Sequence, residues 1–456
     1  MPRHTRASVL RAAPATLRKS AKTSPSPSVA RGLSSDPLPV WPLAAGFAGY
    51  PLWWILGVGD LIWPMLATIM VGYLAGRGRS TVQLPRGFGL WLLFLLWMSL
   101  SVVQIDTFGR FLGFAFRALL YLSATVVFVY VYNARERITR QYVAHLSSVF
   151  LAVMTVGGFL GVAYPLLSLR TPLAYALPRW ISENEFVQEM VVRRVTQFNP
   201  DAWAPGFPRP SAPFVYTNGW GYAYAVILPV AMAYAIKSRG HRRLRWLLPT
   251  IALSTIPAFL TLNRGMFLGL GVALVYLIAR AVADRNAKVI TTVLVFSVVG
   301  ALLFTVLPIG ERLNQRLDTS STTEDRYGLY VEAIERTAES PIIGFGAPRP
   351  SETAGAPAVG TQGQLWMVIF SHGFGAAIPF WAWYVVVLRR SWRLRDPVSM
   401  AMGAAILSTA VTTIFYGILN TGIMIIFMVC GAVMQPSTDE PDIDARSASS
   451  GRSRTG

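Results

Sequence analysis

Long apolar stretches recur along the chain between Trp41 and Met434, separated by short polar turns. Each is roughly 17–25 residues long, which is enough to cross a bilayer as a helix. We predict twelve spans, beginning near residues 41, 60, 87, 109, 142, 214, 246, 265, 288, 362, 398 and 418. The last two share one apolar run, Val398 to Met434, which is predicted to break around 416–420. The pattern therefore predicts an all-α, polytopic integral membrane protein.

Composition supports this class. Of the 456 residues, 53% are hydrophobic and only 14% are charged, whereas soluble proteins have about 25% charged residues. An ordinary soluble enzyme is thereby excluded. The net charge of +19 would suggest nucleic acid in a soluble chain, but most basic residues lie between spans, so we expect a lipid bilayer and no nucleic acid as partner. The single cysteine, Cys430, excludes an intrachain disulfide and a cysteine-based metal cluster.

The charges of the short loops predict orientation. Basic residues gather on one side of the predicted spans, which the positive-inside rule assigns to the cytoplasm together with both termini. They are Arg77, Arg79, Arg86, Arg135, Arg137, Arg140, Lys237, Arg239, Arg242, Arg243, Arg245, Arg280, Arg285, Lys288, Arg389, Arg390, Arg393 and Arg395. We therefore expect a multi-pass protein of the plasma membrane.

Three regions follow from these patterns. Residues 1–36 are basic and rich in Ser and Pro, and 436–456 are polar; both are predicted to be disordered cytoplasmic tails. The first tail also resembles an organellar transit peptide, which we consider the weaker interpretation. Residues 37–435 form the transmembrane domain.

Two long loops, about 169–213 and 310–361, are predicted to lie outside. Loops of this length in a compact domain usually carry function. The first is predicted to contain an amphipathic helix from Trp180 to Phe198. In the second, Thr322 and Asp325 fit a capping box, and the helix should run to about Ala338.

Ionisable residues are scarce inside the predicted spans, where we identify Arg117 and His372 and no acid. A transporter commonly keeps ionisable residues at the midplane, so this scarcity argues against one. An arginine at the centre of a span costs about 2.5–3.5 kcal/mol on insertion scales, so Arg117 should face protein, water or a bound anion. His372 is expected to be packed and hydrogen-bonded.

The polar residues with the clearest chemistry lie outside. Thr261 to Gly265 turns from one span into the next, and Arg326 opens the predicted loop helix. First-turn amides bind anions, and an arginine beside them strengthens a phosphate site. The alternative is a solvated surface of Arg and Glu side chains.

Three segments resemble the bacterial O-antigen ligase/polymerase superfamily, whose members are membrane glycosyltransferases of the GT-C type. Leu262 to Gly269 resembles the family's Ser-Arg-Gly-Ala turn, with Asn263 in place of Ser. The spacing Arg326-x3-Tyr330-x2-Ala333-x7-Pro341-x2-Gly344-x-Gly346 resembles the family's loop helix and its exit. Residues 360–366 through Gly373-Phe374-Gly375 resemble the segment that enters the next span. The similarity covers about residues 40–435.

The resemblance implies outer-face transfer or polymerisation of a glycan, in bacterial cell-envelope polysaccharide biosynthesis. The donor would be linked to polyprenyl (undecaprenyl) diphosphate, the acceptor would be a glycan or glycolipid, and neither metal nor cofactor is expected. It assigns Arg264 and Arg326 to the donor diphosphate, with Gln362 as third catalytic position and Arg117, Tyr330 and Asn263 as substrate-binding residues.

One departure from the family affects the chemistry. Gln362 stands where the family commonly has a histidine, and an amide cannot act as a general base. The external carboxylates of Glu352, Glu332 and Asp318 are possible substitutes. A catalytically weakened homologue that binds lipid-linked glycan, and a polysaccharide or lipid transporter, therefore remain as alternatives.

Overall fold

The computed structural model describes residues 37–77, 81–182, 185–198, 207–285 and 322–436, with isolated positions at 287, 290–291 and 298. The two predicted tails lie outside these ranges. So do Asp318 and most of the span predicted to begin near residue 288.

The described residues are mainly helical, with two small two-stranded sheets, as the apolar pattern predicts. The structure has helices that are long and apolar enough to cross a membrane: α5 (Phe108–Asn133), α6 (Arg140–Ala163), α10 (Thr217–Lys237), α12 (Arg264–Ala283) and α16 (Gln364–Trp392). Shorter apolar helices are α3 (Ile62–Gly76), α4 (Gly89–Leu100) with η1 (Ser101–Gln104), α11 (Leu244–Leu260), α17 (Pro397–Thr412) and α18 (Thr421–Met434). The stretch from Trp41 forms two short helices, α1 (Trp41–Phe47) and α2 (Tyr50–Leu56), where we predicted one span.

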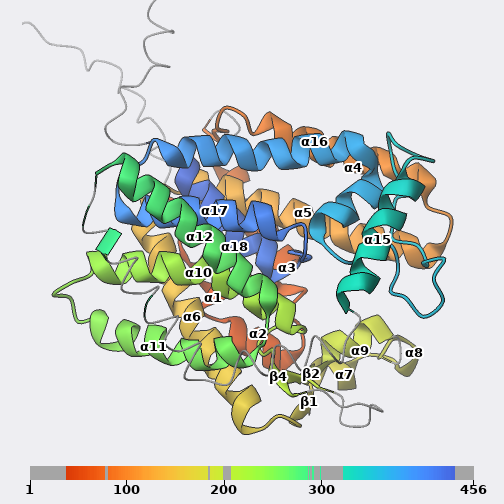
Figure 1. Cartoon of the computed structure of the whole chain (residues 1–456), viewed down its shortest axis with the longest axis horizontal. Helices are drawn as coiled ribbons and strands as arrows, with labels where there is room; N and C mark the ends of the chain where they lie inside the picture. The colour runs from red at the N-terminus through yellow and green to blue at the C-terminus, as the bar shows by residue number, and fades with distance from the viewer. Residues whose placement is uncertain are drawn as a thin grey trace, which may run out of the picture. The chain divides into compact units, whose positions relative to one another are not determined.

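The last two helices form the centre of the bundle. Every residue of α18 is buried, and α17 is buried along most of its length. Helix α17 packs on α10, α12 and α16, while α18 packs on α5 (Figure 1). A helix that is apolar all round is stable only where other helices surround it. The predicted break between them is confirmed, since α17 ends at Thr412, α18 begins at Thr421, and Asn420 has a positive φ of 64°.

Helix α16 is broken at Gly373, whose φ of 76° and ψ of 174° are not helical. Before the break, Gln364 bonds Tyr121 of α5, whereas His372 packs on Phe114, two turns nearer the start of α5. After the break, Phe380 packs on Trp91 and Phe94, and Trp383 on Phe88, so the chain then runs toward the start of α4. The two segments of α16 therefore run in opposite directions along α4 and α5.

The reversal places the start of α16 inside the bundle. Tyr121, the partner of Gln364, lies 13 residues after Phe108, the first residue of α5. At 1.5 Å per residue this is about 20 Å along the α5 axis. The first segment of α16 therefore begins deep among the helices and rises toward the α4–α5 turn.

The first long loop differs from the prediction of one helix over Trp180 to Phe198. It contains α7 (Pro172–Ala176), α8 (Arg179–Ser182) and α9 (Glu185–Val191), and the chain then becomes extended. Strand β2 (Val192–Arg194) pairs antiparallel with β1 (Ser168–Arg170), and β3 (Thr196–Gln197) with β4 (Arg209–Pro210). Three β-branched residues, Val192, Val195 and Thr196, favour this extended conformation.

A buried ion pair ties this loop to the bundle. Arg193 Nη2 lies 3.1 Å from Asp60 Oδ2, and both side chains are about 95% buried. Tyr50 packs nearby and accepts a hydrogen bond of 3.0 Å from Thr421 of α18. The prediction of one continuous helix is wrong from Val192 onward, where the chain pairs with β1 as a strand and Arg193 bonds Asp60.

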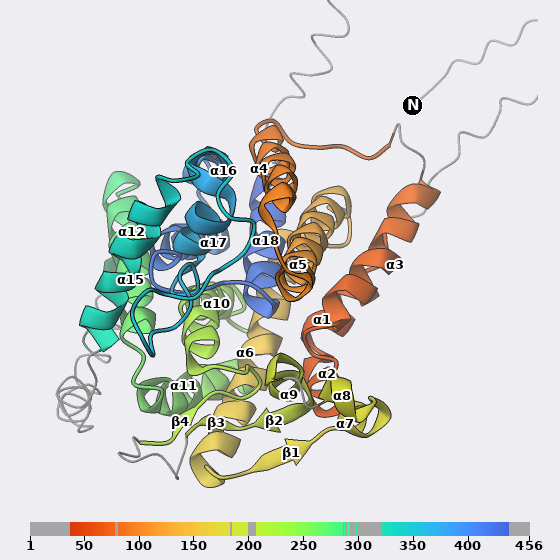
Figure 2. The same ribbon diagram turned by 90° about the vertical axis from the view of Figure 1, so that its right-hand side faces the viewer.

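The second long loop contains α15 (Thr322–Thr337), close to its predicted extent. Figure 1 shows α15 and α7–α9 at the same end of the long helices, with the α10–α11 turn at the opposite end. Figure 2 shows α15 beside α16, which it contacts. Two loops predicted from charge to share a side therefore lie at one end of the bundle.

Topology is testable with introduced cysteines. Thr353 and His241 are exposed and lie in the second long loop and the α10–α11 turn. In a Cys430→Ala background, Thr353→Cys should react with an impermeant thiol reagent in intact cells, and His241→Cys only after lysis. Labelling of the His241 variant from outside would show that the orientation in the membrane is opposite to the predicted one.

Candidate functional site

The turn that follows α15, which contains Pro341, Gly344 and Gly346, packs against the break in α16 at Gly373. The amides of Phe345 and Gly346 donate to the carbonyls of Phe370 and Ser371, at 3.0 and 2.7 Å, and the amide of Phe374 donates to Pro341. These bonds satisfy backbone groups that the interrupted helix leaves without intrahelical partners. Gly344 has a φ of 62°, and a Cβ there would lie 2.6 Å from the backbone nitrogen of His372. Glycine is required because the two backbones touch.

Helix α15 brings three of the predicted residues together. The hydroxyl of Tyr330 donates to the carbonyl of Gln362 at 3.3 Å, and its ring stacks on Trp366 with centroids 4.6 Å apart. Burial raises the pKa of Tyr330, and the charge of Arg326, one turn earlier on the helix, partly offsets this rise. Tyr330 therefore connects α15, on which Arg326 lies one turn earlier, to Gln362 at the entrance to α16.

Gln362 itself has a polar side chain with one local contact. Its Nε2 donates to the hydroxyl of Thr361 at 3.3 Å, and the residue is half-buried. The backbone carbonyl of Gln362 bonds Tyr330, and the described hydrogen bond of its side chain is to its neighbour Thr361.

The turn at Asn263 is a buried structural node. Asn263 caps α12 by accepting a hydrogen bond from the amide of Met266, and its Nδ2 donates to the carbonyl of Thr217 at 3.1 Å. Tyr416 donates its hydroxyl proton to Asn263 Oδ1 and accepts from the amide of Gly265 at 2.7 Å. Asn263 is 2% exposed, and its described contacts hold the start of α12 in place; its role in substrate binding stays a prediction.

Gln364, which the motif comparison did not single out, connects the elements of the site. The side-chain Nε2 donates to the hydroxyl of Tyr121 at 2.5 Å, and the side-chain Oε1 accepts from the backbone amide of Ile418. The backbone amide of Gln364 donates to the carbonyl of Tyr416. The side chain is fully buried. A polar residue inside a predicted span, two positions after Gln362, was the sequence signal for this role.

The amides at the starts of α12 and α16 are already occupied. Gly265 and Met266 donate to Tyr416 and Asn263, and Gln364 donates to the α17–α18 turn. An anion at either helix start must therefore be held mainly by side chains. Arg264, the first residue of α12, is partly buried beside this node.

Arg117 lies on the other side of Gln364. It is one turn before Tyr121 on α5, and Tyr121 is the hydrogen-bond partner of Gln364. His372 is buried and its Nδ1 lies 2.7 Å from the hydroxyl of Ser101, which agrees with the expected packed histidine. Helix α6 carries a further histidine, His145, which the count of ionisable residues in the spans omitted.

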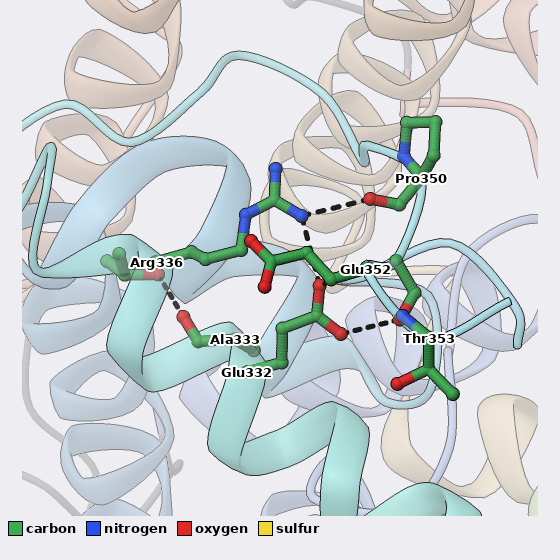
Figure 3. A network of polar contacts seen from close by, with 8 residues as sticks. Glu332, Ala333, Arg336, Pro350, Glu352 and Thr353 are labelled. Carbon is green, nitrogen blue, oxygen red and sulfur yellow. Dashed lines mark hydrogen bonds and ion pairs between the residues drawn. The ribbon is translucent and has the colours of Figure 1, made fainter.

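The external carboxylates differ in their availability. Glu332 pairs with Arg336, one turn later on α15, and reaches the following loop, where it accepts hydrogen bonds from the hydroxyl of Ser351 and the amide of Glu352 (Figure 3). Burial alone would raise the pKa of Glu332, but these hydrogen bonds outweigh it and lower the pKa. Glu332 is therefore a poor general base, whereas Glu352 is exposed. Among the residues that the structure describes, no group of three His, Cys, Asp or Glu side chains could hold a metal ion.

Comparison with known protein families and with curated proteins finds no match to this chain.

The hydrogen bonds of the Tyr416 hydroxyl to Gly265 and Asn263 can be tested by mutation. Tyr416→Phe removes the partner of the buried amide of Gly265 and of Asn263, and an unpaired buried polar group costs about 1–3 kcal/mol. We expect a lower midpoint of thermal unfolding in detergent. Tyr164→Phe, at an exposed position, should leave the midpoint unchanged. Equal midpoints for both variants would contradict the hydrogen-bonded node.

Proposed function

We propose that this chain is an integral-membrane glycosyltransferase. It transfers or polymerises a glycan from a polyprenyl-diphosphate-linked donor to a cell-envelope acceptor at the outer face of the plasma membrane. The observation that carries the proposal is the meeting of three segments distant in sequence. Tyr330 of α15 bonds Gln362, and Gln364, two residues later, bonds Tyr416, which holds the turn that presents Arg264.

The chemistry follows from the charges of this cluster. Loss of a lipid diphosphate develops negative charge, which fixed guanidinium groups stabilise without a metal. Arg326 and Arg264 take this role because the helix-start amides of α12 and α16 have protein partners. Gln362 orients the acceptor hydroxyl by hydrogen bonding, but it cannot remove the proton.

The proposal includes twelve spans with both termini in the cytoplasm. We assign one span to each of the long and shorter apolar helices described above, one to the α1–α2 pair and one to the segment from about residue 288. The basic loops then face the cytoplasm, and α15 and the site open outward.

A second candidate is a homologue that binds lipid-linked glycan without efficient turnover, and Gln362 favours it. The decisive experiment uses the purified full chain in proteoliposomes with a polyprenyl-diphosphate-linked oligosaccharide. Transfer or hydrolysis of the glycan supports the enzyme, and saturable binding without turnover supports the scaffold. Movement of intact donor across the bilayer would support a transporter and reject both.

Gln362 itself can be tested by restoring the histidine. A general base contributes about 10²–10⁴-fold, so Gln362→His should raise transfer at least about tenfold at neutral pH. The control is Gln364→His at the neighbouring amide, which should lower transfer because Gln364 is buried and fully bonded. Unchanged transfer in Gln362→His, with Gln362→Ala also harmless, would show that catalysis does not involve this position.

A further inference from the structure

Glu189, an exposed carboxylate of α9, is held in place by a tyrosine. The hydroxyl of Tyr216 donates to this carboxylate, and both oxygens of Glu189 lie 2.6 Å from it. Burial, together with the adjacent carboxylate, raises the pKa of Tyr216, so its hydroxyl stays protonated and remains a donor. Tyr216 therefore fixes the direction in which the Glu189 carboxylate points.

Apolar packing fixes the helix that carries Glu189. The next two residues, Met190 and Val191, are buried, and Phe116 of α5 packs against their cluster. The carbonyl of Val191 accepts hydrogen bonds from both the amide and the hydroxyl of Thr171. The carboxylate is therefore presented from a short helix that is anchored to the bundle immediately after it.

Tyr216 connects this carboxylate to the turn that presents Arg264. Tyr216 directly precedes α10, and the carbonyl of the next residue, Thr217, accepts a hydrogen bond of 3.1 Å from Asn263 Nδ2. The two segments are in close contact, since a Cβ on Gly221 would lie 2.2 Å from the same Nδ2. Arg264 follows Asn263 in the chain. The carboxylate is thus linked, through one tyrosine and one hydrogen bond, to the position that we propose for the donor diphosphate.

Glu189 differs from the carboxylates that the sequence suggested as bases. Glu332 is paired with Arg336 and accepts two further hydrogen bonds. The ion pairs of the described residues do not include Glu189, and its described hydrogen bonds come from one neutral hydroxyl. An ionised carboxylate has about four lone-pair sites. One hydroxyl donor therefore leaves sites at which Glu189 can accept a proton.

We propose that Glu189 is the general base of the glycan transfer, an assignment that rests on the proposed function. The oxygen of the acceptor hydroxyl bonds to the anomeric carbon of the donor sugar, and its proton moves to the Glu189 carboxylate. The bond from that carbon to the diphosphate breaks, and its electron pair leaves with the lipid diphosphate beside Arg264. Tyr216 acts as a positioning residue. The first long loop thereby supplies the base that Gln362 cannot be.

Transfer by the full chain in proteoliposomes, with a labelled lipid-linked oligosaccharide, tests this assignment. Glu189→Gln keeps the size of the side chain and an acceptor for Tyr216 but removes the base. It should lower transfer by about 10²- to 10⁴-fold and leave donor binding unchanged. Tyr216→Phe should lower transfer less, because the carboxylate remains. The control Glu335→Gln, at an exposed carboxylate of α15, should leave transfer unchanged.

A histidine at position 362 distinguishes a base from a structural residue. Imidazole is a stronger base than a carboxylate, so it should take over removal of the proton. In a Gln362→His background, the loss caused by Glu189→Gln should therefore shrink to about tenfold or less, because two bases that serve one proton are not additive. A loss caused only by displacement of α9 would be equally large in both backgrounds, and that result would overturn the assignment.

Two further outcomes separate this assignment from the proposed function. Turnover by the unaltered chain with an undiminished rate in Glu189→Gln would reject Glu189 as the base and leave glycan transfer standing. A large loss in Glu352→Gln with none in Glu189→Gln would likewise move the base to the second long loop. Absence of turnover in the unaltered chain would instead reject the transferase, and the assignment of Glu189 with it.

Discussion

Replacement of Arg326 or Arg264 by alanine should lower glycan transfer by about 10²- to 10³-fold, the usual effect of removing a group that stabilises developing negative charge. Arg326 lies one turn before Tyr330, which bonds Gln362, and Arg264 starts the helix capped by Asn263. Lysine at either position should also be harmful, since an ammonium group cannot reproduce the bidentate geometry of a guanidinium. Turnover of a labelled lipid-linked oligosaccharide in proteoliposomes gives the rate.

The matched control for Arg326 is Glu335→Ala on the same helix. Glu335 is exposed, so its loss should leave both the rate and the yield of folded protein near those of the unaltered chain. If the Ala and Lys variants at both arginines retain full activity, these residues belong to the surface of the loop and not to a diphosphate site.

Breaking the Asp60–Arg193 pair should produce the largest loss of stability. Both side chains are buried, and Arg193 Nη2 lies 3.1 Å from Asp60 Oδ2. Removal of one partner leaves the other charge buried and unpaired, which costs about 3–5 kcal/mol. Asp60→Ala or Arg193→Ala should therefore lower the unfolding midpoint in detergent strongly and expose the paired strands β1 and β2 to proteolysis.

Two further variants identify the cause. The double replacement Asp60→Leu with Arg193→Met removes both charges and should recover much of the lost stability. Asp106→Ala breaks a pair with Arg110 in which the carboxylate is exposed, so its effect should be much smaller. A double variant as unstable as the single ones would mean that packing, and not unpaired charge, dominates at this position.

The local hydrophobic pattern was sufficient to predict most of the helices, because apolar residues recur along the whole length of a span. The helices that begin at Phe108, Arg140, Arg264 and Pro397 lie within a few residues of their predicted starts. The helix over Thr322–Thr337 is also local, since its start and its stop depend on neighbouring residues. The same reasoning failed at Val192–Arg194, where pairing with β1 and the ion pair with Asp60 outweigh helical periodicity.

The sequence by itself determined the class of protein and the approximate positions of its helices, because hydrophobicity and the charge of short loops depend on nearby residues. It also placed Tyr330 and Gln362 among the candidates, and these two are hydrogen-bonded in the structure. Only the tertiary structure decided that α16 reverses at Gly373 and that Gln364 links Tyr121 to Tyr416. Those features depend on hydrogen bonds between residues far apart in sequence, and no local pattern specifies which distant partner satisfies a buried polar group.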